Sequence, residues 1–530
     1  MNALADFAIL AHGWRRAVML GLAGTLAGLS AAPFFLLPAL FIGFPVLVWA
    51  LDGAEPGAGR LGRVLPPAFG IGFWFALGYF AVSLHWIGAA FFVDGGVQLA
   101  AMPFAILALA AVLALFWGAG TALAHLLWSH GAARILALAG ALSIAEFARG
   151  HLFTGLPFNL VGYALTANLE MMQAASLVGV YGLTLVALVL AGLPALVWPA
   201  ADRTLVARLV PVFVGIGAIT LQLGWGYGRL TAIPLAARED MLVRIVQPAI
   251  PQDLKWQTEA RAETVTRLLD LSAMRTGPED RGLEDITHLI WPEAALPFFI
   301  SDEPELFAQI ARALPDDLLL LAGVPRTAGP ADGTTRPFNS IFAIAPTGEV
   351  ISSYDKTHLV PFGEYLPFQD QLETLGFSQF VHGADGWAPG TARRLMELPG
   401  TPAFLPLVCY EAIYPGGLGA PVREAQFILV ATNDAWFDGS IGLPQHFHHH
   451  RMRALEEGIP LVRAANSGIS GVIDPLGRIT QSLGPGAVGA IDATIPQRLE
   501  ETVFARLGHL PFALGIALVL LAGLAGRLRR

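Results

Sequence analysis

One apolar run near the N-terminus constrains this chain more than any other feature. No charged side chain occurs between Ala17 and Leu51. A helix that crosses the hydrocarbon core of a bilayer needs about 20 apolar residues, so this run is too long for one such helix and suffices for two. The Ser30–Pro33 stretch provides the break between them. The chain is therefore expected to cross a membrane twice within this run.

The charged residues divide the chain into three parts. Residues 1–230 contain 16 of them, nine Arg and seven Asp or Glu, whereas the following 300 residues contain the other 57. The run Leu507–Gly526 again lacks charge and is followed by a tail with three arginines. We therefore predict a membrane domain at 1–230, a globular domain at 231–505, and a last transmembrane helix with a basic tail at 506–530.

Eight transmembrane helices are expected, seven of them in the first part. Their predicted spans are the two halves of Ala17–Leu51, then Val64–Val93, Val97–Ala133, Ile135–Arg149, Met171–Ala201, Leu209–Tyr227 and 509–526. Cytoplasmic loops of membrane proteins are enriched in Lys and Arg. With eight crossings, ten arginines share one side, at positions 15, 16, 60, 63, 134, 203, 208, 527, 529 and 530. Both termini are thus predicted to be cytoplasmic, and residues of about 230–507 to lie outside.

Two ionisable residues stand near the end of the fifth span. Glu146 and Arg149 are three residues apart and can pair on one helix face. Either they form an ion pair that seals the helix end, or they contact a lipid headgroup, since ionisable residues at membrane depth are seldom without function. The sequence leaves both interpretations open.

The globular part has the pattern of an α/β fold. From Met241 on, short β-rich apolar runs alternate with helical patterns, and Pro346–Gly348 marks a hairpin turn. This alternation favours an α/β sandwich over an all-β domain. Strands are expected at Leu242–Gln247, His288–Trp291, Leu318–Gly323, Asn339–Ala345, Glu349–Asp355, Phe404–Val408, Phe427–Ala431, Leu461–Ala464 and Gly471–Asp474, and helices at Trp256–Met274, Glu303–Leu314 and His448–Glu457.

Composition excludes several classes of function. The formal net charge of −9 gives no electrostatic reason to expect a nucleic acid as partner. One cysteine in 530 residues excludes an intrachain disulfide and any zinc or iron–sulfur site built from cysteines. The run His446–His450 invites a metal, but no carboxylate stands at ligand spacing beside it, so we predict structural or solvated histidines. Neither a metal nor another cofactor is expected.

Three side chains together suggest covalent acyl transfer. The chain has only two lysines, Lys255 and Lys356, against 30 arginines, and Cys409 is its one thiol. Glu293, Lys356 and Cys409 each come just after a predicted strand, so they can converge at one sheet edge. A thiol needs a base and a positive neighbour to attack a carbonyl, and the carboxylate and the ammonium would supply them. Taken singly, each has an ordinary explanation, as a solvated carboxylate, a surface lysine or a small buried hydrophobe.

Around these residues the sequence resembles the nitrilase superfamily. Trp291–Ala294, Tyr354–Pro367 and Val408–Glu411 are similar to its Glu–Lys–Cys motifs. The second segment, with its Phe-Gly-Glu-Tyr-Leu-Pro sequence, and the membrane helices on both sides resemble the membrane-embedded branch of that superfamily, the apolipoprotein N-acyltransferase family of the bacterial envelope. The resemblance covers nearly the whole chain. Its other pieces are Arg149–Phe158, Gln252–Trp256, Thr432–Phe437 and Arg451–Glu456.

The resemblance implies a nitrilase-like αββα sandwich outside an α-helical membrane bundle of about eight helices. It implies Cys409 as nucleophile, Glu293 as general base and Lys356 as oxyanion stabiliser. Glu364, Tyr410 and Glu411 match residues that the family uses around its active site, and Trp256 matches one on a substrate-facing loop.

An aromatic-rich segment at 361–380 follows the lysine motif. It contains Phe362 and Tyr365, which we add to the residues expected to bind substrate. The segment could dip into lipid as an arm or lid. Its apolar side chains could equally belong to the core.

The expected activity is transfer of a fatty acyl chain from a phospholipid to the N-terminal amine of a diacylglyceryl-cysteine lipoprotein, through a thioester on Cys409. The enzyme would be a monomer in the bacterial inner membrane, with its catalytic domain on the periplasmic side. One alternative is a membrane-anchored amidase or hydrolase that uses the same three residues. A second is a non-enzymatic transporter with a globular cap, although the few ionisable residues in the helices disfavour an ion path.

Overall fold

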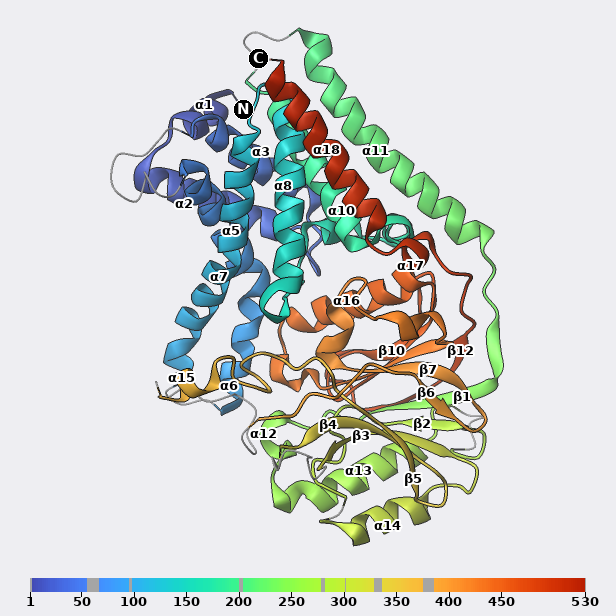
Figure 1. The fold of residues 1–530 in the computed structure, drawn as a ribbon. Coiled ribbons are helices and arrows are strands. Elements are labelled where there is room, and N and C mark those ends of the chain that lie inside the picture. Colours follow the sequence, from blue (N-terminus) through green and yellow to red (C-terminus); the bar gives the residue numbers. More distant parts are fainter. Residues whose placement is uncertain are drawn as a thin grey trace. The chain divides into compact units, whose positions relative to one another are not determined.

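The computed structural model describes residues 2–54, 66–94, 98–199, 204–277, 282–300, 302–327, 336–374 and 386–529. The chain forms two compact units, of which one combines Met1–Ile233 with Thr502–Arg530 and the other is Pro234–Glu501 (Figure 1). The two ends of the chain therefore fold together, and the second unit is inserted between them. That the predicted divisions at 230 and 505 separate functional domains stays a prediction.

The first unit is helical. Its α-helices are α1 (Asn2–Leu10), α2 (Gly13–Gly28), α3 (Leu37–Asp52), α5 (Pro67–Leu84), α6 (Phe91–Asp94), α7 (Gln98–Leu126), α8 (Ala132–His151), α9 (Leu169–Met172), α10 (Ala175–Gly192), α11 (Leu205–Ala232), α17 (Val503–Leu507) and α18 (Leu510–Leu528). Short 3-10 turns join some of them, at η1 (His85–Ala90), η2 (Leu152–Thr154), η3 (Val161–Leu165) and η4 (Leu193–Leu196). The last helix, α18, packs against α8 and α10, which brings the C-terminal span into the bundle.

Six helical stretches among the described residues are long and apolar enough to cross a membrane. They are Pro67–Val93, Leu99–Leu126, Ala132–Thr154, Ala175–Leu196, Leu205–Ala232 and Leu510–Leu528. The first two predicted spans correspond to α2 and α3, which have 16 residues each. A helix of that length measures about 24 Å, short of the roughly 30 Å of a bilayer core. The total of eight crossings therefore stays a prediction, and Arg60, Arg63, Arg203 and Arg530 of the orientation argument lie outside the described residues.

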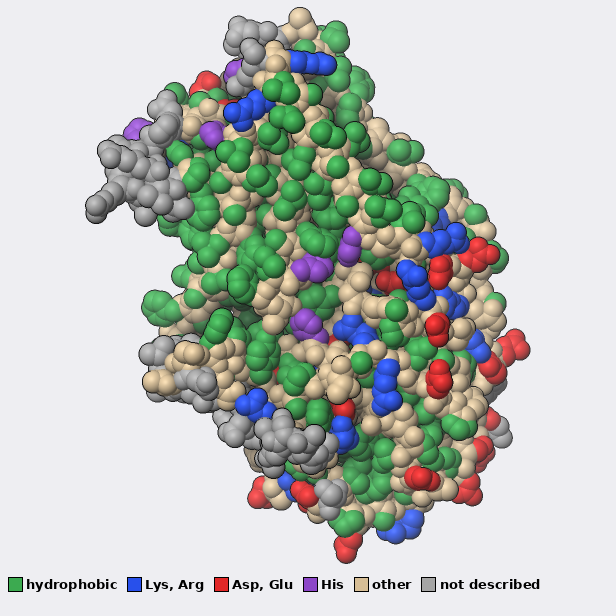
Figure 2. Space-filling model, in the orientation of Figure 1, with side chains coloured by type: hydrophobic (Ala, Val, Ile, Leu, Met, Phe, Trp, Pro, Cys, Tyr) green, Lys and Arg blue, Asp and Glu red, His purple; other side chains and the backbone are tan. Residues whose placement is uncertain are grey.

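The outer surface of the long helices is apolar. Phe213 and Leu221 of α11 and Leu518 of α18 are each at least 66% exposed. Figure 2 shows hydrophobic side chains gathered over α11 and α18, whereas charged side chains gather over the α/β unit. An apolar surface of this extent is unfavourable in water but suits the hydrocarbon of a bilayer. The first unit is a membrane bundle.

The predicted pairing of Glu146 with Arg149 is present in α8. Their ion pair measures 2.7 Å, and both side chains are fully buried. Trp117 Nε1 donates to Glu146 Oε1 at 2.7 Å, and the Arg149 guanidinium donates to the backbone carbonyls of Leu156 and Phe158. Because protein groups occupy both partners, the arrangement favours an ion pair that seals the helix end over a headgroup site.

The second unit contains two six-stranded sheets. The first has the order β12 (Gly489–Pro496), β1 (Ala237–Gln247), β2 (His288–Ile290), β3 (Leu319–Arg326), β4 (Phe338–Ile344) and β5 (Val350–Asp355). The second has the order β11 (Ile479–Leu483), β10 (Ser470–Ile473), β9 (Leu461–Ala465), β8 (Phe427–Thr432), β7 (Thr401–Val408) and β6 (Met396–Leu398). The helices are α12 (Gln252–Lys255), α13 (Arg261–Ala273), α14 (Pro304–Ala313), α15 (Gln369–Thr374) and α16 (Gly442–Glu457), with 3-10 turns η5 (Thr258–Ala260), η6 (Cys409–Ile413), η7 (Ala420–Arg423) and η8 (Asp434–Phe437).

Three apolar layers hold the sheets and helices together. Leu268 of α13 and Ile310 of α14 pack on one face of the first sheet. Its other face packs against the second sheet, where Ile290 and Val462 belong to one buried cluster. Ala454 of α16 covers the far face of the second sheet. The unit is thus an αββα sandwich, which confirms the predicted α/β fold.

Strand direction fixes where the site forms. Strands β1, β2 and β3 are parallel, as are β7, β8 and β9. Strand β4 is antiparallel to both of its neighbours, so β5 runs in the same direction as β2 and β3. The residues that follow β2 and β5 therefore emerge at one edge of the first sheet, and those that follow β7 and β8 at one edge of the second.

Candidate active site

Cys409 occupies a sharp turn at the end of β7. The strand ends at Val408, and Cys409 starts the 3-10 turn η6 with a φ of +50°. A positive φ is uncommon for a residue other than glycine and is held only where the surroundings enforce it. The Cys409 side chain is half-buried. Such a strand-to-helix turn lifts a side chain above the sheet edge, where a reactant can reach it.

Glu411 holds this turn in place through hydrogen bonds. It is fully buried, and its carboxylate accepts hydrogen bonds from the Val408 amide at 2.8 Å and the Tyr354 hydroxyl at 2.9 and 3.1 Å. It also accepts from the amide and hydroxyl of Thr357 at 2.9 and 2.7 Å, and from the His358 amide at 3.2 Å. Since Thr357 directly follows Lys356, Glu411 ties the lysine loop to the cysteine turn.

Glu293, Lys356 and Glu364 meet beside the edge of the first sheet. Lys356 Nζ lies 2.8 Å from each carboxylate oxygen of Glu364 and 3.9 Å from Glu293 Oε1. Asn339 Nδ2 bridges the two carboxylates, at 2.6 Å to Glu293 Oε1 and 3.1 Å to Glu364 Oε1. All four side chains are more than nine-tenths buried. The ammonium is therefore fixed between two carboxylates.

The other oxygen of Glu293 is also held. Its Oε2 accepts from the Asn433 backbone amide at 2.7 Å. Asn433 directly follows β8 of the second sheet, so this hydrogen bond joins the edges of the two sheets. The Asn433 side chain accepts from Asn466 Nδ2 at 3.0 Å and donates to Gln252 Oε1 at 2.7 Å. Glu293 is thus oriented through a network of amides.

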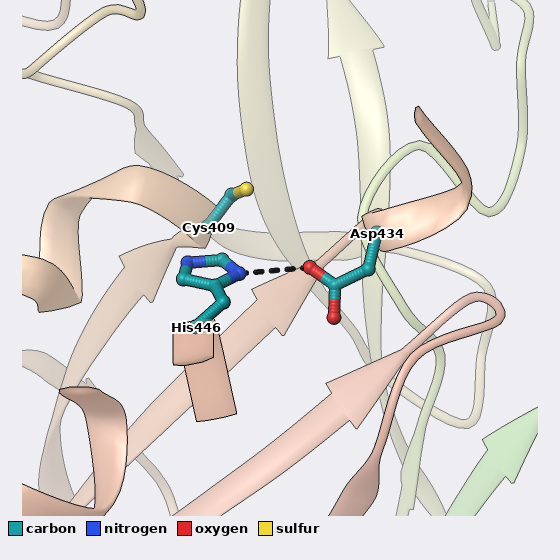
Figure 3. A group of neighbouring side chains, drawn as sticks. All are labelled: Cys409, Asp434 and His446. Atoms are coloured by element: carbon teal, nitrogen blue, oxygen red, sulfur yellow. Dashed lines mark hydrogen bonds and ion pairs between the residues drawn. The ribbon is translucent and has the colours of Figure 1, made fainter. Parts of the chain in front are cut away.

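Cys409 belongs to the same cluster. Its Sγ lies within 4.8 Å of ligand-type atoms of Asp434 and His446, and Asp434 adjoins the Asn433 that holds Glu293 (Figure 3). Burial raises the pKa of the Cys409 thiol, the Glu293 carboxylate adds to the rise, and Lys356 opposes it. The thiol is therefore protonated at neutral pH and needs a base to become a nucleophile.

The charges of Glu293 and Lys356 each shift the pKa of the other residue. Burial raises the pKa of Glu293, against the opposing positive charge of Lys356. Burial alone would lower the pKa of Lys356, but the Glu364 and Glu293 carboxylates outweigh it and hold that pKa above its usual value. Lys356 is thus a permanent cation, and Glu293 is a stronger base than a solvated carboxylate.

The histidine run is structural. It lies inside α16, which begins six residues before the predicted helix His448–Glu457, and all four of its histidines are buried. The sequence argument missed a carboxylate, because Asp434 comes from a distant turn to accept from His446 Nδ1 at 2.8 Å. Burial lowers the pKa of His448 to about 3 and also lowers that of His450. These side chains are neutral.

Cys409, Asp434 and His446 are residue types that bind metals. However, Asp434 Oδ2 accepts from Arg463 Nη2 at 2.7 Å while Oδ1 accepts from His446. Burial raises the pKa of Asp434, but the Arg463 charge outweighs burial and holds that pKa below its usual range. A guanidinium already neutralises this carboxylate, so the geometry fits a hydrogen-bonded chain and we assign no metal to it.

Two further predicted residues, Tyr410 and Trp256, make aromatic contacts. Tyr410 is buried next to Cys409, and its ring contacts those of His358 and Tyr414. Trp256 follows α12 and packs near Trp387, with ring centroids 6.1 Å apart.

The aromatic segment after Lys356 is partly open to solvent. Phe362 is half exposed, whereas Tyr365 is half-buried and its carbonyl accepts from the Phe362 amide at 2.8 Å. Residues 375–385, which include the last six residues of the predicted arm, lie outside the described residues.

Sequence reasoning missed three contributors to the site. Asn339 and Asn433 orient Glu293, and Lys255 Nζ donates to the Glu293 backbone carbonyl at 2.9 Å. The rarity of lysine was a usable signal for Lys255. Nothing in the sequence alone distinguishes Asn339 from other strand residues, whereas Asn433 lies within a segment that carried the family resemblance.

Comparison with known proteins identifies the family. A model described as the apolipoprotein N-acyltransferase N-terminal domain matches residues 23–193, and a carbon-nitrogen hydrolase model matches residues 242–503. An apolipoprotein N-acyltransferase of Rhodopseudomonas palustris is 44% identical over 523 residues, which cover 98% of this chain and 97% of that protein. The chain belongs to the apolipoprotein N-acyltransferase family. This confirms the resemblance seen in its motifs.

Further apolipoprotein N-acyltransferases are similar over nearly the same length. That of Bradyrhizobium diazoefficiens is 45% identical over 525 residues, with the same shares covered, and that of Brucella suis is 41% identical over 500 residues, covering 93% of this chain and 92% of that protein. Among solved structures, an amidase from Nesterenkonia sp. covers 53% of this chain and 99% of its own, at 18% identity and a TM-score of 0.34. The chain is an acyltransferase enzyme.

Proposed function

We propose that this enzyme transfers a fatty acyl chain from a phospholipid to the N-terminal amine of a diacylglyceryl-cysteine lipoprotein, through a thioester on Cys409. The observation that carries the proposal is the buried cluster in which Lys356 Nζ stands 3.9 Å from Glu293 Oε1 and the thiol is electrostatically coupled to both. These are the groups that covalent acyl transfer requires: a nucleophile, a base and a cation for the oxyanion.

In the first half-reaction, Glu293 takes the Cys409 proton as Sγ attacks the ester carbonyl of the phospholipid. Negative charge develops on the carbonyl oxygen, and Lys356 stabilises it. The ester C–O bond then breaks, and the proton on Glu293 passes to the departing alkoxide. The products are a lysophospholipid and an acyl thioester on Cys409.

In the second half-reaction, the neutral N-terminal amine of the acceptor attacks the thioester carbonyl. Glu293 takes a proton from the attacking nitrogen, the C–S bond breaks, and the thiolate regains a proton. The result is an amide, and the kinetics are ping-pong because the lysophospholipid leaves before the acceptor binds. Water must be excluded in between, since it would hydrolyse the thioester.

The remaining site residues have supporting roles in this proposal. Glu364 fixes Lys356, and Glu411 fixes the turn that presents the thiol. Tyr410, Trp256, Phe362 and Tyr365 provide the aromatic surroundings for the acyl chain. The half-exposed Phe362 supports this assignment, since an apolar ring open to the surroundings suits contact with lipid.

We further propose that the chain crosses the bacterial inner membrane eight times as a monomer. The domains are the membrane domain 1–230, the periplasmic catalytic domain 231–505, and the last helix with its tail at 506–530, with both termini cytoplasmic. The arginine distribution supports this orientation. A membrane location lets both lipid-linked substrates reach the thiol by lateral diffusion.

The two rival functions are less consistent with these observations. The relatives are named as acyltransferases, which speaks against a non-enzymatic transporter. A hydrolase could use the same three residues, and it differs in what happens to the thioester.

The test is mass spectrometry of the intact protein after incubation with phospholipid vesicles. We expect an increase equal to one fatty acyl chain on wild-type protein and none on Cys409→Ala, which has no thiol at all. Glu293→Gln and Lys356→Arg should form the adduct at least about 100-fold more slowly. An adduct on Cys409→Ala, or none on the wild type, would overturn the proposal.

A further inference from the structure

The two lysines of this chain lie at the same glutamate. Lys356 Nζ stands 3.9 Å from the Glu293 carboxylate, and Lys255 Nζ donates to the Glu293 backbone carbonyl at 2.9 Å. Both lysine side chains are 1% exposed. Burying an ammonium is costly unless it is paired, so a second buried lysine at this position requires an explanation beyond chance.

The short helix α12 is connected to Glu293 by hydrogen bonds in two ways, directly through Lys255 and indirectly through Asn433. Lys255, its last residue, holds the Glu293 peptide. Gln252, its first residue, accepts from Asn433 Nδ2, and the Asn433 amide in turn donates to Glu293 Oε2 at 2.7 Å. The helix itself is anchored where it starts, because Asn466 exchanges hydrogen bonds with the amide and carbonyl of Ile250. Movement of α12 would therefore displace both the backbone and the carboxylate of Glu293.

Strand β3 holds the backbone on either side of Glu293, through hydrogen bonds to Trp291, Pro292 and Leu296. Strand β2 ends at Ile290, and the following Ala294 has a φ of +46°. Gly323 of β3 lies directly against this segment, where a Cβ would come within 2.6 Å of Glu293 Cα. The Gly323 amide of β3 donates to the Pro292 carbonyl at 3.2 Å. The Glu293 carbonyl, in contrast, accepts from the Lys255 side chain.

We propose that Lys255 is a positioning residue for the general base: it holds the Glu293 peptide in place and adds a second positive charge beside the carboxylate. The inference rests on the proposed role of Glu293. Lys356 and Lys255 then have separate tasks, the first facing the reacting carbonyl and the second positioning Glu293.

Electrostatics support this division. The Lys255 charge lowers the pKa of Glu293, which burial and the neighbouring Glu364 raise. Burial in turn lowers the pKa of Lys255 to about 8, opposed by the Glu293 and Cys409 charges that face it. Removing the Lys255 charge should leave Glu293 protonated up to a higher pH.

The experiment measures alkylation of Cys409 by iodoacetamide against pH, followed by intact mass on full-length protein in vesicles. Because Cys409 is the only cysteine, every adduct reports on it. Lys255→Met should slow alkylation at least about 10-fold at pH 7 and move the acidic limb of the profile upward by about one unit. Lys255→Arg keeps the charge and should leave the limb where the wild type has it.

A matched control is Arg267→Met, which removes a cation that donates to a different backbone carbonyl, that of Pro248, at 2.7 Å. Its profile should equal that of the wild type. If Lys255→Met does not fold, Lys255→Gln replaces it, since the amide keeps a hydrogen-bond donor and loses only the charge. The acidic limb of its alkylation profile must again move to higher pH.

An equal loss of rate at every pH, with an unmoved limb, would show that Lys255 is merely structural and would overturn the inference. This outcome is distinct from failure of the proposed function. In that case wild-type protein would form no acyl adduct with phospholipid, whatever the alkylation profiles of the lysine variants.

Discussion

Lys356 Nζ lies 2.8 Å from both carboxylate oxygens of Glu364 and 3.9 Å from the nearest oxygen of Glu293. The resting ion pair is therefore between Lys356 and Glu364. Glu293 remains close enough for electrostatic interaction with the ammonium but does not form a direct hydrogen bond to it. This asymmetry assigns one carboxylate to hold the cation and leaves the other available to accept a proton.

Replacing Glu364 with Gln should separate these two tasks. The variant loses the anchor of Lys356, so the maximal rate of acyl-adduct formation should fall by about 10–100-fold. It also removes a negative charge that raises the pKa of Glu293. The acidic limb should therefore move to lower pH, opposite to the shift expected for Lys255→Met. Glu349→Gln, at an exposed site, serves as the control, and a limb that moved upward would contradict this assignment.

The activity of the wild type should depend on pH through Glu293. Its pKa is raised, with burial as the main cause, and catalysis needs the ionised form. Activity is therefore present above that pKa and lost as pH falls through it, so half-loss should come above pH 4.3, the usual value for a glutamate. The measurement is the initial rate of adduct formation from pH 4 to pH 8. A flat rate down to pH 4.3 would exclude Glu293 as the titrating base.

Glu411→Gln should destabilise the protein as well as inactivate it. An amide oxygen cannot replace both carboxylate oxygens, and the NH2 group of the glutamine would face the buried amide of either Val408 or Thr357, since these donate to different oxygens of Glu411. We expect a loss of about 2–4 kcal/mol in the free energy of unfolding of the α/β unit. Thermal unfolding in detergent would record it as a lower Tm. The exposed Glu424→Gln should leave the Tm within error.

The fate of the thioester distinguishes transferase from hydrolase. Without an acceptor, acyl-Cys409 should persist for many times the turnover period, and a peptide with an N-terminal diacylglyceryl-cysteine should discharge it rapidly. Intact mass against time, with and without the peptide, measures both rates. Equally fast loss in plain buffer, with release of free fatty acid, would favour the hydrolase.

Membrane orientation can be tested with fusions. A reporter that is active only in the cytoplasm should give signal when fused after Arg530 and none when inserted near Gly282. The ten arginines predicted to share one side set this expectation. Signal from the Gly282 position would mean that the α/β unit faces the cytoplasm.

Much of the α/β fold could be predicted because its strands are apolar runs with clear boundaries. The turn at Pro346–Gly348 forms as expected, with Gly348 at a φ of +83°. The edge strands β6, β11 and β12 were missed. β6 has only three residues, and β11 is largely exposed, so neither carries the apolar periodicity that marks a buried strand.

The part of the site that could be predicted from the sequence consists of residues that directly follow strands. Glu293 and Lys356 follow strands of one sheet, which brings them together by topology alone. Asn433 and Asp434 could not be assigned this way, because their roles depend on how the second sheet packs on the first. His446 is the clearest example: its carboxylate partner comes from a turn 12 residues away, and spacing along the chain does not predict it.

The burial of both lysines bears on self-modification. An enzyme that stores an acyl group as a thioester carries an electrophile that any nearby unprotonated amine can attack. In this chain the competing amines are only Lys255, Lys356 and the N-terminal amine, and neither lysine is open to solvent. The thirty arginines supply the positive charge elsewhere without being nucleophiles at neutral pH. The surface of the molecule thus offers the stored acyl group almost no wrong acceptor.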